Sequence, residues 1–143
     1  MLAVEGDLAE PATADRIVDE ALQRFGRIDT LVNNAGVYIS KPFTDYTAAD
    51  YALASGVNLA GFFWITQRAI AEMATRYGGH VVNITATLAE VANSGEPAVL
   101  SALTKGGLAA ATRSLAVEYA SRGIRVNAVS PGIIQTPVYP TDS

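Results

Sequence analysis

The sequence predicts an α/β fold built on a parallel sheet, and two observations lead to this class. Short β-prone runs alternate with longer segments in which apolar residues recur every three or four positions. The helical segments are long enough to cross from one parallel strand to the next, as a doubly wound sheet requires. We therefore expect a three-layer α-β-α arrangement with helices on both faces. Half of the 143 residues are apolar, which is enough for one domain over residues 1–143.

The first part of the chain predicts the end of one strand, a helix and a second, buried strand. Residues 2–4 form a short apolar run that ends at a turn, as the last residues of a strand would. Residues 11–25 carry apolar side chains at the spacing of one helix face, and Gly26 follows as a C-terminal cap. Residues 28–32 are β-prone and end at the polar cluster Asn33-Asn34-Ala35-Gly36.

The remaining two thirds continue the alternation. The capping-box pattern Thr47-Ala48-Ala49-Asp50 predicts that a long helix starts there. In chain order, the expected elements are a helix from 47 to about 77, a strand over 80–85, a helix from 97 to about 121, a strand over 124–129 and a loop over 130–132. Ligands collect at the carboxyl ends of such strands, so the loops there are the expected site.

Composition excludes several classes of function. The net charge is −4 and the ten Lys and Arg residues are scattered, so we expect no nucleic-acid partner. There is no cysteine and a single histidine, His80, which argues against a metal site. The start of the chain is acidic, and no apolar run approaches the ~20 residues that span a bilayer. We expect a cytoplasmic protein with no membrane partner.

Six short motifs follow one another along the chain. They are Gly6-Asp7-Leu8, Asn33-Asn34-Ala35-Gly36, Val57-Asn58-Leu59, Val82-Asn83-Ile84-Thr85, Thr104-Lys105-Gly106-Gly107 and the run from Arg125 to Gly132. In this order they resemble the short-chain dehydrogenase/reductase family, Rossmann-fold enzymes that move hydride between a nicotinamide cofactor and a carbonyl or alcohol. The resemblance implies a partial Rossmann fold and NAD or NADP as the cofactor, with the choice between them open.

The resemblance also implies roles for individual residues. The residues that would line the cofactor are Asp7, Leu8, Asn34, Ala35, Gly36, Lys105, Pro131, Gly132, Ile134 and Thr136. The catalytic positions would be Asn58, Thr85, Ser101 and Lys105. In the family, this lysine binds the ribose hydroxyls and lowers the pKa of a tyrosine through its positive charge. The backbone carbonyl of the asparagine holds a water molecule in a proton relay.

The chain departs from the family at the proton donor. The family has a tyrosine four positions before the lysine, where this chain has Ser101, and the family's serine position falls on Ala86. Thr85 or Thr87 could supply the missing hydroxyl. Serine titrates far above the tyrosine value of about 10 and is shorter by a whole ring, so we expect impaired chemistry.

Three further hypotheses concern this position. A bound water could bridge the distance from Ser101 to a substrate. Tyr139 could fold over the site from the C-terminal side. The pair Ser101 and Lys105 could form a hydrolase dyad, which the lack of an evident oxyanion hole disfavours.

The second departure is a missing motif. No G-x-G-x-x-G fingerprint for a pyrophosphate is present, and the resemblance starts at the family's third strand and stops just past Thr136. We therefore expect a member truncated at both ends. With the Rossmann strand order 3-2-1-4-5-6, the run at 2–4 loses its neighbour and the strand at 28–32 becomes an edge.

Two functions remain open at this stage. The first is an NAD(P)-dependent oxidoreductase for a carbonyl or alcohol substrate, impaired in this form. The alternative is a non-catalytic Rossmann-like module for dimerisation or ligand sensing. The resemblance implies a homodimer or homotetramer formed through helices 47–77 and 98–121, and the substrate cannot be inferred.

Overall fold

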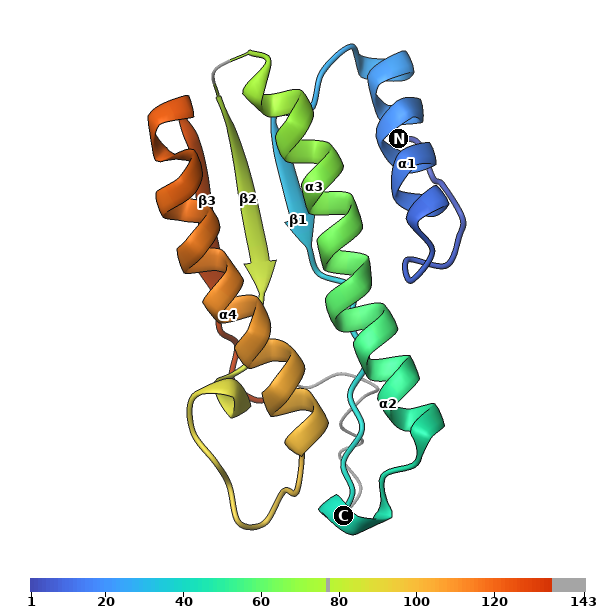
Figure 1. Ribbon diagram of the computed structural model, residues 1–143, viewed down its shortest axis with the longest axis vertical. Helices are drawn as coiled ribbons and strands as arrows, with labels where there is room; N and C mark the ends of the chain where they lie inside the picture. Colours follow the sequence, from blue (N-terminus) through green and yellow to red (C-terminus); the bar gives the residue numbers. More distant parts are fainter. Residues whose placement is uncertain (77, 135–143) are drawn as a thin grey trace.

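The computed structural model describes residues 1–76 and 78–134, and its centre is a parallel sheet of three strands (Figure 1). The strands are β1 (Thr30–Asn33), β2 (Gly79–Ile84) and β3 (Ile124–Val129), in the order β1-β2-β3. Asn33 lies opposite Asn83, and Ile84 lies opposite Val129. The α/β class and the parallel pairing are confirmed, and β1 is an edge strand as expected.

Four helices accompany the sheet. They are α1 (Pro11–Phe25), α2 (Ala48–Ser55), α3 (Gly61–Ala74) and α4 (Val99–Tyr119). Single turns lie at η1 (Phe43–Asp45), η3 (Thr87–Ala89) and η4 (Ala120–Arg122). α1 has the expected bounds, and Gly26 ends it at a φ of 76°, with its N–H donating to Leu22 O at 2.8 Å. That left-handed conformation strains any residue with a Cβ.

The long helix expected from 47 to 77 is interrupted by a π turn. The Thr47–Asp50 capping box starts α2, and η2 (Gly56–Ala60) joins α2 to α3 with a Gly61 N–H to Gly56 O bond. π turns often occur at functional sites because they redirect side chains out of the helical register. Here the π turn contains Asn58. α3 ends at Ala74, and Tyr77 lies outside the described residues.

Both long crossover helices cover the same face of the sheet (Figure 1). Val81 and Val126 point to that face and are buried, whereas Arg125 and Asn127 point to the other face and are exposed. The strands follow each other in one direction across the sheet, so right-handed crossovers place α3 and α4 on one side. The described residues therefore form two layers, and the third layer that the sequence predicts is not among them.

The strand expected at residues 2–4 is wrong. These residues belong to no strand in the described part of the chain, and Leu2 is exposed. A strand needs a neighbour to satisfy its backbone donors and acceptors. The sheet ends at β1, so residues 2–4 have no strand beside them.

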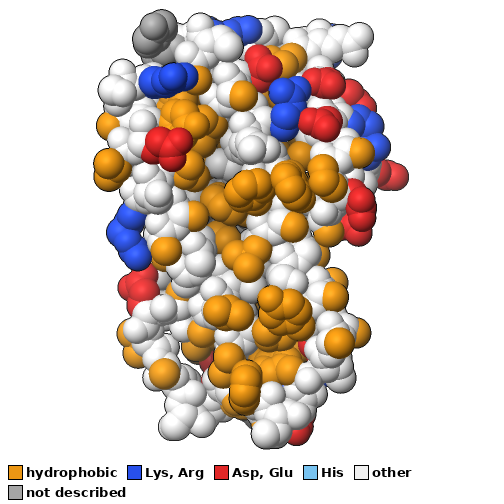
Figure 2. Space-filling model, in the orientation of Figure 1, with side chains coloured by type: hydrophobic (Ala, Val, Ile, Leu, Met, Phe, Trp, Pro, Cys, Tyr) orange, Lys and Arg blue, Asp and Glu red, His pale blue; other side chains and the backbone are white. Residues whose placement is uncertain are grey.

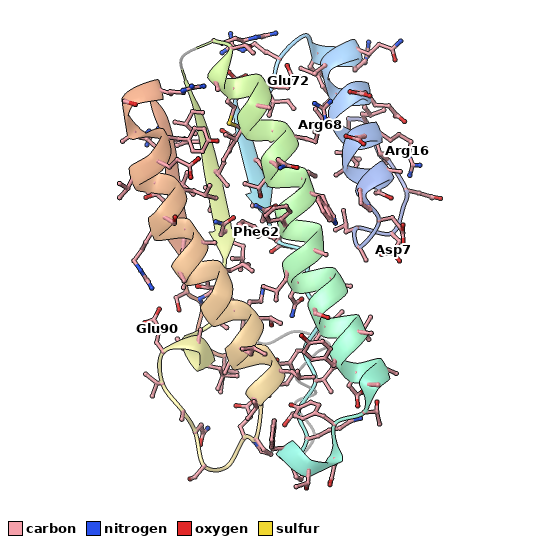
Figure 3. The ribbon with its side chains drawn as sticks, viewed as in Figure 1. Asp7, Arg16, Phe62, Arg68, Glu72 and Glu90 are labelled. Atoms are coloured by element: carbon pink, nitrogen blue, oxygen red, sulfur yellow. The ribbon has the colours of Figure 1, made fainter. Side chains whose placement is uncertain are left out.

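The core lies between the sheet and α3. It consists of Ala69, Ile70, Met73, Val81, Ile124 and Val126. α1 packs on the outer side of α3, where Arg68 pairs with Asp15 and Asp19, each at 2.9 Å. Figure 3 shows Arg68 on the side of α3 that faces α1. This packing holds α1 against α3, and α3 against the sheet. The carboxyl-terminal edge of the sheet is left open for a site.

Candidate functional site

A cleft of about 240 Å³ lies at the carboxyl ends of the three strands, beside the first turns of α4. Its walls are formed by Asn34, Gly36, Val37, Tyr38, Thr85, Ala86, Leu88, Ser101, Lys105, Pro131, Gly132 and Ile134. These residues come from loops that are far apart in the sequence, and the parallel sheet brings them to one edge. The cleft thus joins both ends of the predicted site, from Asn34 to Ile134.

A smaller pocket of about 70 Å³ shares Asn34 with this cleft. It contains the other predicted residues Leu8, Ala35 and Asn58. Leu8 approaches α3 closely because Gly61 has no side chain; a Cβ there would lie 3.0 Å from that of Leu8. The chain before α1 is therefore packed against the site, although it forms no strand.

Among the described residues, one predicted cofactor residue, Asp7, lines neither space. Asp7 Oδ1 accepts a hydrogen bond from Ala9 N–H at 2.9 Å, so its carboxylate shapes the turn before α1. Thr136 lies outside the described residues, as does Tyr139. The prediction for these two positions is not tested.

Lys105 is the cation of the cleft. Its Nζ donates to Ile84 O at 2.7 Å, at the end of β2. Burial lowers the pKa of Lys105 because the charged form loses hydration. A Cβ on Gly36 would lie 3.1 Å from Nζ, so the glycine makes room for the ammonium group. A lysine held in this way presents its remaining N–H donors to the cleft.

Asn58 is buried between the loop after β1 and α4. Its amide accepts from Val37 N–H at 2.8 Å and donates to Val37 O at 3.0 Å and to Thr104 Oγ1 at 3.1 Å. Every polar group of the side chain is therefore used within the protein. Any direct role of Asn58 toward a ligand falls to its backbone, and its side chain is a positioning group for the loop.

Ser101 occupies the place four residues before Lys105, one turn away on α4. It is 5% exposed and lines the cleft, as Ala86 does on the opposite loop. Thr85 also lines the cleft, but its hydroxyl donates to Val129 O at 3.1 Å. Thr87 is exposed and does not line it. Of the two threonines, only Thr85 is placed to meet a ligand.

A buried polar ladder under the cleft was not expected from the sequence. Asn33 Nδ2 donates to Asn83 Oδ1 and Thr66 Oγ1 at 2.8 and 2.9 Å, and Asn83 Nδ2 donates to Thr112 Oγ1 at 2.8 Å. The ladder ties β1 and β2 to α3 and α4. The sequence shows Thr104 and Thr112 eight residues apart on one helix face, but only Thr112 belongs to the ladder, and Thr104 accepts from Asn58 instead.

The cleft wall formed by Tyr38 was also missed. The Tyr38 hydroxyl donates to the Glu96 carboxylate, and Ser40 Oγ donates to Pro97 O at 2.9 Å. These bonds join the loop after β1 to the loop before α4. Sequence offered no signal for them, because both loops lack a periodic pattern.

The described ranges hold neither a helix able to cross a membrane nor a cluster of metal-ligating side chains. Over residues 1–76 and 78–134, no helix combines the length and apolar character that crossing a membrane requires. In the same ranges, no three His, Cys, Asp or Glu side chains gather in a way that could hold a metal ion.

Comparisons with known proteins agree with this geometry. The family model described as enoyl-(acyl carrier protein) reductase matches residues 1–141. Oxidoreductase UcpA from Escherichia coli strain K12 is 40% identical over 137 residues, which are 95% of this chain and 51% of UcpA. The chain thus spans about half the length of the curated relatives it matches.

Solved structures show the same likeness. A gluconate 5-dehydrogenase from Burkholderia cenocepacia J2315, in complex with NADP and tartrate, superposes with a TM-score of 0.87 at 32% identity, over 93% of this chain and 51% of that one. A short-chain type dehydrogenase/reductase from Mycobacterium marinum gives 0.89 at 27% identity, over 94% and 53%. The chain belongs to the short-chain dehydrogenase/reductase family.

Proposed function

We propose that this chain, as a single domain, forms the nicotinamide and substrate side of an NAD(P)-dependent oxidoreductase that acts on a carbonyl or alcohol. The observation that carries the proposal is the placement of Lys105, which extends from α4 to Ile84 O and reaches the backbone of Gly36. A half-buried lysine at the carboxyl edge of a parallel sheet is suited to hold the hydroxyls of a ribose. A dehydrogenase relative of the same family contains NADP.

The described residues fit one end of such a cofactor. Asn34 and Gly36 expose backbone next to the cleft, and Gly36 lacks the Cβ that would meet Lys105. Pro131 and Gly132 form the opposite wall. No glycine-rich phosphate loop is present among residues 1–76 and 78–134. The fit is therefore to the nicotinamide and its ribose, and the pyrophosphate has no binding loop in the described chain.

The chemistry separates into what the cofactor supplies and what this chain does. A nicotinamide cofactor supplies or accepts the hydride when it is bound. Lys105 orients the ribose and holds a positive charge beside the reacting group, and burial strengthens that field. Ser101 stands where the proton is transferred, but its hydroxyl is a much weaker acid than a phenol. We propose that turnover in this form is impaired for this reason.

A ligand-binding module without turnover is the second candidate. The observation that favours it is the state of the two hydroxyls in the cleft. Ser101 replaces the proton donor, and Thr85 uses its proton on Val129 O. Such a site can bind a nicotinamide cofactor without catalysing the reduction of a carbonyl.

Isothermal titration with NADPH tests the proposal. We expect saturable binding that is weakened about tenfold or more in Lys105→Met, because hydrogen bonds to a charged donor are lost. Arg113→Met removes a charge from the exposed side of the same helix and should bind as the wild type does. Equal affinity in all three chains contradicts the assignment of Lys105.

The two candidates are separated by turnover. If the module is correct, the wild-type chain shows no carbonyl reduction. If the oxidoreductase is correct, it shows a slow reduction that Ser101→Ala and Lys105→Ala both lower. A measured reduction that survives both Ser101→Ala and Lys105→Ala would show that the catalytic assignment is wrong.

We also propose self-association through α3 and α4. A groove of about 340 Å³ runs between these helices and includes Phe62, Phe63 and Leu115. Phe63 is 52% exposed and Val117 is 81% exposed. Figure 2 shows hydrophobic side chains gathered over this face. Exposed apolar helix faces of this size favour burial against another copy, as a homodimer or homotetramer.

A further inference from the structure

The cleft beside Ser101 has the size of an aromatic ring. Its volume is about 240 Å³, and a cavity of about 150 Å³ already holds benzene in another protein. The lining includes Ser101 from α4 and Leu88 from the turn after β2. A serine side chain occupies little of this space, so a ring can enter it.

The lining of the cleft is mixed in polarity. Val37, Leu88 and Ile134 are apolar, and Tyr38 is aromatic. Lys105, Ser101 and Asn34 carry hydrogen-bonding groups. Apolar walls with a few convergent polar groups are the usual composition of a small-molecule site.

Lys105 defines what the polar part of the lining can bind. Its ammonium group has three donors, and the hydrogen bond to Ile84 O uses one of them. No carboxylate in residues 1–76 and 78–134 forms an ion pair with it. A ligand oxygen that accepts a hydrogen bond from Lys105 would satisfy a donor in a half-buried place.

We propose that this cleft binds a small phenol, with its ring between Leu88 and Tyr38 and its hydroxyl between Lys105 Nζ and Ser101 Oγ. A phenol hydroxyl accepts from the ammonium group and donates to the serine oxygen, so both partners are satisfied. A carboxylate on the same ring would pair with Lys105 but would lose its own hydration in a half-buried place, and that desolvation cost can exceed the gain from pairing. The neutral aromatic alcohol is therefore the better match.

The wall against which the ring would stack is already in place. Tyr38 is bonded to Glu96, and Lys41 N–H donates to Pro97 O at 3.0 Å. Both loops are thus joined before any ligand enters. A preformed aromatic wall lowers the conformational cost of binding a rigid ring.

The inference rests on the proposed function only in treating this cleft as the substrate side; the binding itself needs no hydride transfer. Titration of the ¹⁵N-labelled chain with phenol, followed by NMR, tests it. We expect saturable shifts at Gly36, Lys105 and Gly132 with a Kd on the order of millimolar, as suits so small a ligand. Benzoate should bind about tenfold more weakly or not at all, and tighter binding of benzoate would overturn the choice of phenol.

Three variants test whether the shifts come from binding in this cleft. Ser101→Tyr fills the ring space and should abolish the shifts, and Leu88→Trp narrows the same space from the exposed η3 turn if the first variant does not fold. Lys105→Met should weaken phenol by about tenfold, the loss of one charged hydrogen bond. Unchanged phenol binding in a folded Ser101→Tyr or Leu88→Trp chain would overturn the proposal.

The two proposals fail in different ways. Phenol binding without NADPH binding leaves the ring subsite in place and contradicts the oxidoreductase proposal. NADPH binding without phenol binding leaves the oxidoreductase proposal in place and overturns the subsite.

Discussion

Asn58 holds both backbone polar groups of Val37, accepting from its N–H at 2.8 Å and donating to its carbonyl at 3.0 Å. This pairing fixes the loop that leaves β1 against the π turn of the long helix. Val37 itself lines the cleft, so the pairing sets the position of the wall that faces Lys105. The structural role of Asn58 is thus to hold the site in shape.

Replacing Asn58 should destabilise the chain. Asn58→Leu leaves the Val37 N–H and carbonyl without partners in a place where Asn58 is 2% exposed. Buried groups without a partner cost about 1–3 kcal/mol each, so we expect a loss of about 2–4 kcal/mol in the free energy of unfolding. Urea unfolding followed by circular dichroism measures it.

The matched control for this experiment is Asn127→Leu. Asn127 is exposed on the uncovered face of β3, so its replacement should change stability by less than about 0.5 kcal/mol. Similar losses of unfolding free energy in both variants would contradict a stabilising role for the Asn58 hydrogen bonds.

Lys105 should make stability rise with pH. Its pKa is lowered in the folded chain, so between that value and 10.5 the unfolded state binds more protons than the folded state. The cost of burying the charge is fully present below the lowered pKa and is gone only above 10.5, the ordinary value. The difference in stability between wild type and Lys105→Met should therefore shift in favour of the wild type as pH rises toward 10.5. Urea unfolding at a series of pH values measures it; a difference that stays constant with pH contradicts the burial of this charge.

Asp50 should contribute stability that acid removes. The hydrogen bond from Lys41 Nζ at 2.7 Å, followed by those from Thr47, lowers the pKa of Asp50 to about 2. The folded value is below the ordinary 3.8, so this contribution is present above pH 3.8 and is lost as pH falls toward 2. Thermal unfolding of wild type and Asp50→Asn should converge over that range.

The neighbouring turn supplies the control for Asp50. Asp45→Asn alters an exposed carboxylate in η1, which lies outside the capping box. This variant should lose stability in acid as the wild type does. If Asp45→Asn removes as much acid dependence as Asp50→Asn, the capping box is not the cause.

The sequence predicts those features of the fold and of the site that depend on residues close together in the chain. α1 and β3 have the expected bounds because periodicity, Gly26 and Gly123 act within a few residues. The sequence also predicts that Asn34, Lys105 and Pro131 lie close together, because parallel strands end at the same edge of a sheet.

Other features depend on contacts that no local pattern contains. The run at residues 2–4 is apolar enough for a strand, but pairing needs a partner, and the sheet stops at β1. The π turn contains Asn58, whose amide bonds to Val37 and Thr104, and both partners lie far away in the sequence. The one-sided covering of the sheet follows from the strand order.

Self-association should depend on the exposed face of α3 and α4. A charge at Phe63 or Val117 cannot be buried without a partner, so Phe63→Glu and Val117→Glu should convert an oligomer to a monomer. Light scattering coupled to size exclusion measures the mass. Val91→Glu, on an exposed loop away from the groove, is the control, and a monomeric wild type would contradict the proposed interface.

The location of NADPH on this chain tests the central claim most directly. NMR titration of the ¹⁵N-labelled chain should give saturable shifts at Asn34, Gly36, Lys105 and Gly132. Saturation should need about tenfold more NADPH in Lys105→Met and the same concentration in Arg113→Met. Residues of the α3–α4 groove, such as Ser114 and Glu118, should not shift. Shifts confined to that groove, or saturation of Lys105→Met at the wild-type concentration, would contradict a nicotinamide site at the carboxyl edge of the sheet.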